Sequence, residues 1–247
     1  MIFCIHDLET SGLVIGEARI IEAACVLFDR DRAEIIEQWS SLIYDNSYGT
    51  FDSIEAHNAF AVNGISKMTL YKHGMNPVTA FKIVNRYFER ADYIVGHNIL
   101  NFDIPLLGFE AAQFNTTITN KPKFDTRSDI EYPSRHYSKR LSHLCSDFSI
   151  PTFDSHRALG DCVSLSKLLK HVQVTDEMLE KSKSPLIKII GEISFKENEK
   201  REEAKKRRFM WDAQNKQWYK LIRECDFDKE NDVTSFMIRK VPYDKTT

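Results

Sequence analysis

Short apolar runs open the chain, and apolar residues at helical spacing follow further on. Residues 3–8, 19–28 and 34–44 are rich in aliphatic and aromatic side chains, a composition typical of β-strands. A charged turn at residues 29–32 separates the last two of these runs. Consecutive strands at this spacing predict an antiparallel β-meander. Residues 46–74 are polar and irregular, and we expect short helices or loops there.

After residue 74 the pattern alternates between helices and strands. Pro77 suits the first turn of a helix, which an apolar stripe extends to about residue 89. Short strands are predicted at residues 93–95 and 123–125. Further helices are predicted to begin near residue 101, to span residues 141–148 and to end near residue 172. This alternation after a β-meander predicts an α/β fold in which helices flank a mixed sheet.

The first predicted strand ends in two acidic residues on its apolar face. Side chains two positions apart share one face of a strand, so Asp7 and Glu9 continue the row of Phe3 and Ile5. Paired carboxylates at the end of a buried strand repel each other, and a cation is the simplest group that would keep both ionised. The alternative is a solvated strand end, and Asp-x-Glu alone does not separate the two.

Two more acids fall on apolar stripes of predicted helices. Asp103 precedes Leu106 and Leu107 at helical spacing, and Asp161 precedes Leu165 in the same way. A helix cap is an alternative role for Asp103, because acids favour the positive end of a helix. Four acids at buried positions of different elements nevertheless point to one cause, a site for divalent cations. Oxygen ligands without a cysteine or histidine cluster favour Mg²⁺ or Mn²⁺ over zinc.

Composition sets outer limits on this interpretation. The 247 residues are 42% hydrophobic and 28% charged, enough for one full core and a small second module. The formal net charge of −2 argues against a protein coated with positive charge but allows a basic patch. Five cysteines without a Cys-x-x-Cys pair predict buried reduced thiols. With no run suited to a signal peptide or a membrane span, we expect a cytoplasmic protein without membrane association.

Three segments resemble, in order and internal spacing, the motifs of the DEDDh 3′-5′ exonucleases, relatives of the bacterial proofreading epsilon subunit and of exonuclease X. The segments are Asp7-Leu8-Glu9-Thr10-Ser11-Gly12, His97-Asn98 with Phe102-Asp103, and the run from His156 to Asp161. Weaker agreement at residues 63–68, 124–126 and 141–150 extends the resemblance over roughly residues 1–172.

The resemblance implies a ribonuclease H-like fold and a metal-dependent exonuclease. It implies that Asp7, Glu9, Asp103 and Asp161 bind two Mg²⁺ or Mn²⁺ ions and that His156 is the general base. The expected reaction is hydrolysis of DNA from 3′ ends with release of 5′ mononucleotides. An exoribonuclease is the nearest alternative, and a non-catalytic nucleic-acid-binding module is a more remote one.

The resemblance also implies contacts with the substrate, which we expect to be single-stranded DNA or a DNA 3′ end. Thr10, Gly12 and Leu13 are expected near the terminal nucleotide, and Asn98 near the penultimate one. For Leu13, ordinary core packing is an equal alternative. Association with replication or repair proteins is left open.

The sequence divides into an exonuclease domain at residues 1–175, a linker and charged helix at residues 176–200, and a small β-rich module at residues 201–247. The module resembles the Trp-containing segment appended to some exonuclease X-like proteins. Basic residues stand beside Trp211 and Trp218 there, a combination that suits single-stranded nucleic acid. The alternative is that both tryptophans form the core of the module.

Overall fold

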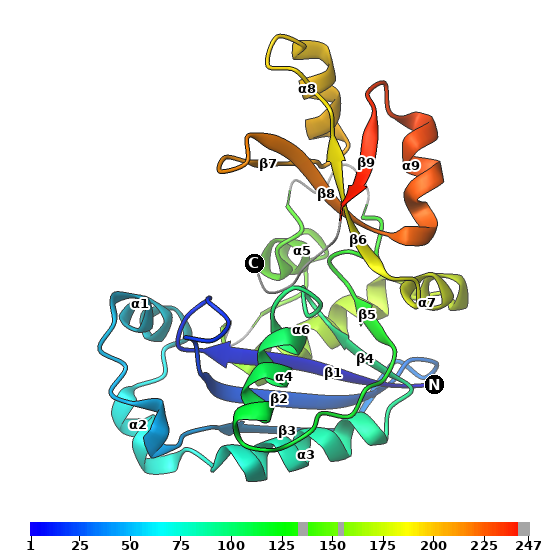
Figure 1. Cartoon of the computed structure of the whole chain (residues 1–247). Coiled ribbons are helices and arrows are strands. Elements are labelled where there is room, and N and C mark those ends of the chain that lie inside the picture. The colour runs from blue at the N-terminus through cyan, green and yellow to red at the C-terminus, as the bar shows by residue number, and fades with distance from the viewer. Residues whose placement is uncertain (133–137, 153–155, 242–247) are drawn as a thin grey trace. The chain divides into compact units, whose positions relative to one another are not determined.

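The computed structural model describes residues 1–132, 138–152 and 156–241 (Figure 1). The chain divides into two compact units, Met1–Asp176 and Glu177–Thr247. The four acids and His156 all belong to the first unit, so the architecture of that unit determines whether they meet.

A five-stranded sheet forms the centre of the first unit, in the order β3-β2-β1-β4-β5. The pairs β1–β2 and β2–β3 are antiparallel, whereas β1–β4 and β4–β5 are parallel. The strands are β1 (Ile2–Thr10), β2 (Ile20–Asp29), β3 (Glu34–Leu42), β4 (Tyr93–Gly96) and β5 (Lys123–Asp125). The predicted meander and mixed sheet are therefore confirmed.

Helices lie on both faces of this sheet (Figure 1). His6 of β1 meets Phe88 of α3 edge to face, with 5.2 Å between ring centroids, and the next residue, Asp7, faces α6 on the other side. The helical segments of this unit are η1 (Asn46–Tyr48), α1 (Ile54–Asn63), α2 (Lys67–His73), α3 (Pro77–Glu89), α4 (Asp103–Gln113), α5 (Leu141–Asp147) and α6 (Ala158–His171). Helix α7 (Asp176–Ser182) spans the boundary between the units.

Helix α4 begins at Asp103, slightly later than the sequence predicts. The carboxylate of Asp125 accepts hydrogen bonds from the backbone N–H groups of Asn98 (2.8 Å) and Leu100 (3.1 Å), which fixes a turn between β4 and α4. Asn98 has a left-handed backbone, φ 74°, within that turn. Helix α3 has the predicted bounds, with Pro77 in its first turn and the Asn76 side chain accepting from the Val78 N–H.

Aromatic side chains from the sheet and from helix α3 build the core of the first unit. Among its largest fully buried side chains are Phe3, Phe28, Phe81, Phe88 and Phe124. The five cysteines are free, and four of them are buried as predicted. Cys225, in the second unit, is exposed, so the prediction of burial is wrong for that residue.

The second unit contains a four-stranded antiparallel sheet in the order β7-β8-β6-β9. Its elements are β6 (Leu186–Gly191), α8 (Asn198–Lys206), β7 (Met210–Asp212), β8 (Gln217–Arg223), η2 (Glu224–Asp226), α9 (Phe227–Val233) and β9 (Ile238–Val241). Its core contains Ile189, Ala204, Phe209, Trp218, Ile222, Phe236 and Ile238.

The structure differs from the sequence prediction at the start of this unit. The sequence predicts a linker and a charged helix at residues 176–200; the helix is present as α8, but β6 precedes it. β6 pairs with β8 on one side and β9 on the other, and it buries Ile189 completely. An isolated hairpin leaves its apolar face uncovered, and β6 supplies the strand that completes the sheet.

None of the helices in the described ranges combines the length and the apolar character that a membrane crossing requires.

Candidate active site

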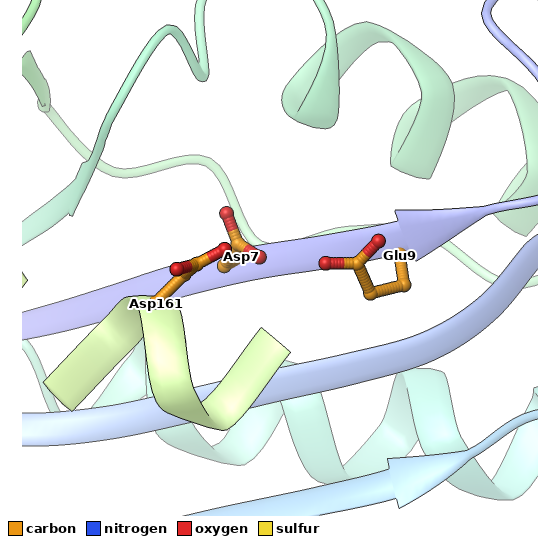
Figure 2. Close-up of side chains that lie close together, drawn as sticks. All are labelled: Asp7, Glu9 and Asp161. Carbon is orange, nitrogen blue, oxygen red and sulfur yellow. The ribbon is translucent and has the colours of Figure 1, made fainter. Parts of the chain in front are cut away.

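Three carboxylates from two distant parts of the chain converge at one face of the sheet (Figure 2). Asp7 and Glu9 lie two residues apart on β1, and Asp161 comes from the first turn of α6. One oxygen of each lies within 4.8 Å of the others. Figure 2 shows the Asp161 carboxylate beside that of Asp7, with Glu9 further along the strand. The strand alternation and the helix stripe therefore direct these side chains to a common point.

The fourth acid, Asp103, lies beside this group but outside the set of three. It is the first residue of α4 and is only 6% exposed. Its Oδ1 accepts a hydrogen bond of 3.2 Å from the backbone N–H of Leu8, the residue between Asp7 and Glu9. Its negative charge contributes to the raised pKa of Asp7.

Burial and mutual repulsion disfavour the ionised forms of these acids. Burial, followed by the charges of Asp103 and Asp161, raises the pKa of Asp7 well above its usual value. Burial and the charge of Asp161 raise the pKa of Glu9 to about 8, and burial raises the pKa of Asp103 to about 7. A nearby cation would stabilise the ionised form of carboxylates whose pKa values are raised in this way.

The donor set fits a hard divalent ion. Asp7, Glu9 and Asp161 offer carboxylate oxygens at mutual distances that one ion can bridge, and Asp103 is adjacent. Mg²⁺ and Mn²⁺ prefer such oxygen ligands. The predicted grouping of acids is therefore present in the structure for three members, with the fourth next to them.

His156 lies outside helix α6, which begins two residues later at Ala158. The sequence required this, because a histidine five residues before Asp161 on one helix would face away from it. His156 is exposed and has a left-handed backbone, φ 62°. Its N–H donates to Oδ2 of Asp161 at 3.2 Å, so its backbone is tied directly to one of the clustered acids.

The predicted substrate residues lie at the end of β1, in the turn that follows it, and in the turn between β4 and α4. The Thr10 hydroxyl donates to the carbonyl of Gly12 at 2.7 Å, which shapes the turn after β1. Leu13 in that turn is 81% exposed, so the alternative that it packs in the core is wrong. A Cβ at Gly12 would make only ordinary contacts with neighbouring side chains, so protein packing alone does not require glycine there. Asn98 lies in the turn between β4 and α4, where its Oδ1 accepts from Asn101 at 3.0 Å.

His97, which precedes Asn98 in the motif, has a structural environment. Its Nδ1 lies 2.9 Å from the Thr126 hydroxyl oxygen and its Nε2 lies 2.7 Å from the Lys139 carbonyl oxygen. Burial lowers its pKa to about 4. Both ring nitrogens lie within hydrogen-bond distance of protein atoms, which indicates a structural role for this histidine.

Two residues of the site were missed in the sequence. Glu22 of β2 is 3% exposed and stands opposite Glu9 in the antiparallel register. Its carboxylate accepts from Nε (3.0 Å) and Nη2 (2.6 Å) of Arg157, the residue after His156. The available signal was one acid inside the apolar run of residues 20–28, where an unpaired charge would be costly.

A comparison with known protein families agrees with this geometry. The RNase_T family model, described as an exonuclease, matches residues 4–169 and so covers most of the chain. This chain belongs to the RNase_T exonuclease family. The family membership expected from the motifs is thereby confirmed, and the protein is a nuclease, a hydrolase of nucleic acids.

Individual relatives extend the comparison. The chain is 29% identical over 203 residues to the DNA polymerase III subunit epsilon of Treponema pallidum (strain Nichols), covering 77% of this chain and 88% of that protein. It also resembles E. coli exonuclease I in complex with a dT13 oligonucleotide, with a TM-score of 0.61, 18% identity, and coverage of 77% of this chain and 48% of that one. A zinc-bound complex of the same enzyme with single-stranded DNA gives a TM-score of 0.60 at 19% identity, covering 78% and 48%.

These likenesses carry different weight. The exonuclease I structures share the ribonuclease H-like exonuclease fold, and this chain spans about half of their length. The family match supplies the nuclease assignment, and the family is metal-dependent, in agreement with the carboxylate cluster.

Proposed function

We propose that this nuclease is a DEDDh-type 3′-5′ exonuclease that removes 5′ mononucleotides from DNA 3′ ends with two Mg²⁺ or Mn²⁺ ions. The observation that carries the proposal is the convergence of Asp7, Glu9 and Asp161 within 4.8 Å, with Asp103 bonded to the backbone between the first two. Asp7, Glu9 and Asp161 are half-buried and Asp103 is buried. Acids that repel one another at such short distances do not stabilise a fold by themselves, and a cation-dependent reaction on a phosphodiester explains their grouping.

The acids and His156 have separate roles in this mechanism. Asp7, Glu9, Asp103 and Asp161 would hold the ions, which supply an acidified water and neutralise charge on the phosphate and the leaving 3′ oxygen. His156 accepts the proton of the attacking water. Its exposed position before α6 leaves the imidazole accessible to a bound DNA end, while its backbone is tied to Asp161.

The turn after β1 provides a surface for the terminal nucleotide. Leu13 and Val14 are both exposed there, only a few residues beyond Glu9. Apolar side chains in that position suit contact with a base, and the Thr10–Gly12 hydrogen bond holds the turn that presents them. We assign Thr10, Gly12 and Leu13 to the terminal nucleotide and Asn98 to the preceding one.

DNA is the favoured substrate, with RNA as the alternative. The epsilon relative is a subunit of a DNA polymerase, and the exonuclease I structures contain DNA oligonucleotides. Both observations concern those proteins, and they support single-stranded DNA or a 3′ end as the ligand here, with replication or repair proteins as partners. The non-catalytic alternative leaves the convergence of the acids without a purpose.

Matched oligonucleotides test the proposal. We expect 5′-labelled single-stranded DNA to shorten stepwise in Mg²⁺, with 5′ mononucleotides as the product, and EDTA to abolish the reaction. The RNA of the same sequence should be shortened at a lower kcat/KM. Binding of DNA without shortening would favour the non-catalytic module, and faster digestion of RNA would favour the exoribonuclease.

The second unit is proposed to contribute a contact with single-stranded nucleic acid. Trp218 is in the core of this unit, whereas Trp211 is 48% exposed, with 5.4 Å between the two ring centroids. The core alternative thus holds for Trp218, whereas Trp211 is exposed and available for the proposed contact. Exposed Lys206 and Arg208 lie just before the β7 strand that carries Trp211, and aromatic faces beside cations suit unpaired bases and phosphates.

Replacing Trp211 by Ala should weaken DNA binding without slowing turnover. Stacking on an aromatic side chain contributes about 1–3 kcal/mol per base, so we expect Kd to rise at least about fivefold. The measurement is fluorescence anisotropy with a labelled single-stranded oligonucleotide in EDTA. The control is Met210→Ala, which removes an exposed apolar side chain from the opposite face of the same strand. Equal Kd values for the two variants would contradict a stacking role.

A further inference from the structure

The Glu22 carboxylate, on β2, accepts hydrogen bonds from several groups of the site. Besides the two hydrogen bonds from the Arg157 guanidinium, it accepts one of 3.0 Å from the backbone N–H of Ala158. Both oxygens of Glu22 are engaged by Arg157, which distinguishes this acid from the neighbouring Glu9. Paired planar contacts of this kind fix orientation as well as distance.

These hydrogen bonds determine how helix α6 begins. The first N–H groups of a helix have no partner within it, and a residue at the cap normally supplies one. Arg157 occupies the cap position of α6 and provides no side-chain cap. Glu22 accepts from the first helical N–H instead, so a carboxylate from β2 holds the end of the helix that carries Asp161.

The segment around His156 is consequently held on both sides. The His156 N–H is bonded to Asp161, and the Arg157 side chain and the Ala158 N–H are bonded to Glu22. The left-handed φ of 62° is uncommon for a residue other than glycine and persists only where surrounding contacts enforce it. The contacts with Asp161 and Glu22 hold this conformation. Asp161 is itself one of the clustered acids, and Glu22 lies on β2, the strand paired with β1.

The pair also limits the charge of the site. The Glu22 side chain is 4% exposed and that of Arg157 is 43% exposed, so Glu22 is the buried member of the pair and Arg157 is the solvent-facing one. Glu22 stands opposite Glu9 in the antiparallel register. The guanidinium thus offsets the negative charge that Glu22 would otherwise add next to Glu9.

We propose that the Arg157–Glu22 pair is a positioning device that fixes the His156 segment relative to the acids, so that the imidazole is held in register with the phosphodiester. This inference rests on the proposed role of His156 as the base. A purely structural pair would affect folding stability alone. A positioning pair changes kcat with little change in KM, and its effect requires His156.

A double-mutant cycle with Arg157→Ala, His156→Ala and the combined variant tests the proposal. We expect Arg157→Ala to lower kcat for Mg²⁺-dependent shortening of single-stranded DNA by about 10- to 100-fold, since small misplacements of a reacting group have effects of this size. KM should change less than about twofold, because the pair contacts no substrate group assigned above. In the His156→Ala background, adding Arg157→Ala should have no further effect.

Two variants and one physical measurement sharpen the test. Arg157→Lys keeps the positive charge but loses the paired guanidinium contacts with Glu22, so its kcat should lie between those of Arg157→Ala and the wild type. Arg90→Ala is the matched control, because it removes an Arg–Glu pair between the residue that follows α3 and strand β3. Nη2 of Arg90 lies 2.6 Å from Oε2 of Glu37, and the variant should leave kcat unchanged. In Arg157→Ala, amide hydrogen exchange at His156 and Ala158 should accelerate at least about tenfold.

The outcomes separate this proposal from the function on which it rests. If His156→Ala has no effect on kcat, the base assignment fails. If His156→Ala slows the reaction and Arg157→Ala slows it by the same factor with or without His156, the positioning role alone is overturned. Wild-type kcat in Arg157→Ala, or unchanged amide exchange, would also overturn it. The exchange measurement applies even if the wild type does not shorten DNA.

Discussion

Replacing Asp7 by Asn should abolish most DNA shortening, with a loss of at least about 100-fold in kcat. Mutation of a residue that only hydrogen-bonds a metal ligand already lowers metal affinity or activity by about 10- to 100-fold. Removal of the ligand itself should lower kcat by more than this. Asp7 is the acid whose pKa is raised by burial and by four neighbouring carboxylates together. The measurement is single-turnover shortening of labelled DNA in Mg²⁺.

The same variant should be more stable than the wild type when metal is removed. The pKa of Asp7 is raised in the folded protein, so the stability contributed by its protonated form is lost as the pH rises through that raised value. Asn carries no charge, and the variant should therefore have a higher Tm than the wild type in EDTA at pH 8. Mg²⁺ should raise the Tm of the wild type and have little effect on Asp7→Asn.

Asp52→Asn provides the control for both measurements. It neutralises an exposed carboxylate that is paired with Lys67 at 3.0 Å and does not belong to the acid cluster. It should retain full activity and a normal response of Tm to Mg²⁺. A Mg²⁺ response in Asp7→Asn equal to that of the wild type would contradict the assignment of Asp7 as a ligand.

Replacing His156 by Ala should lower kcat by about 10²- to 10⁴-fold, the usual contribution of a general base. Because His156 is not among the proposed ligands, the rise of Tm in Mg²⁺ should remain. The measurements are single-turnover rates and thermal unfolding with and without Mg²⁺.

The contrast between the two variants identifies the roles. Asp7→Asn should lose both activity and the response to metal, whereas His156→Ala should lose activity alone. His143→Ala, which removes another exposed histidine from α5, should behave as the wild type. Loss of the Mg²⁺ response in His156→Ala would argue that this residue supports the metal site instead of the proton transfer.

Much of the first unit follows from local pattern. The bounds of α3 and β5 agree with the prediction, because a proline-initiated apolar stripe and a short apolar run leave little freedom in where these elements begin. The second unit was less predictable. Residues 186–191 contain a short apolar run whose role as β6 depends on β8 and β9, which come later in the chain. Periodicity describes one segment at a time, so it does not show which segments pair.

Two acids of helix α4 show the same limit of sequence periodicity at the candidate site. Asp103 and Glu110 both lie on the buried stripe of α4, and apolar periodicity alone does not distinguish their roles. In the structure Asp103 bonds to the backbone of β1 beside Asp7, whereas Oε2 of Glu110 accepts from the N–H of Ile20 at 2.7 Å. The surroundings of the two acids therefore separate a candidate ligand from a carboxylate that anchors β2.

The sequence by itself determined that Asp7, Glu9, Asp103 and Asp161 occupy inward-facing positions, since the periods of strand and helix fix which side of an element is buried. Only the tertiary structure decided what each acid meets. It placed Asp161 against β1, and it revealed the contact of Arg157 with Glu22, 135 residues away. The direction of a side chain is a local property of the backbone, whereas its partner depends on how distant segments are packed together.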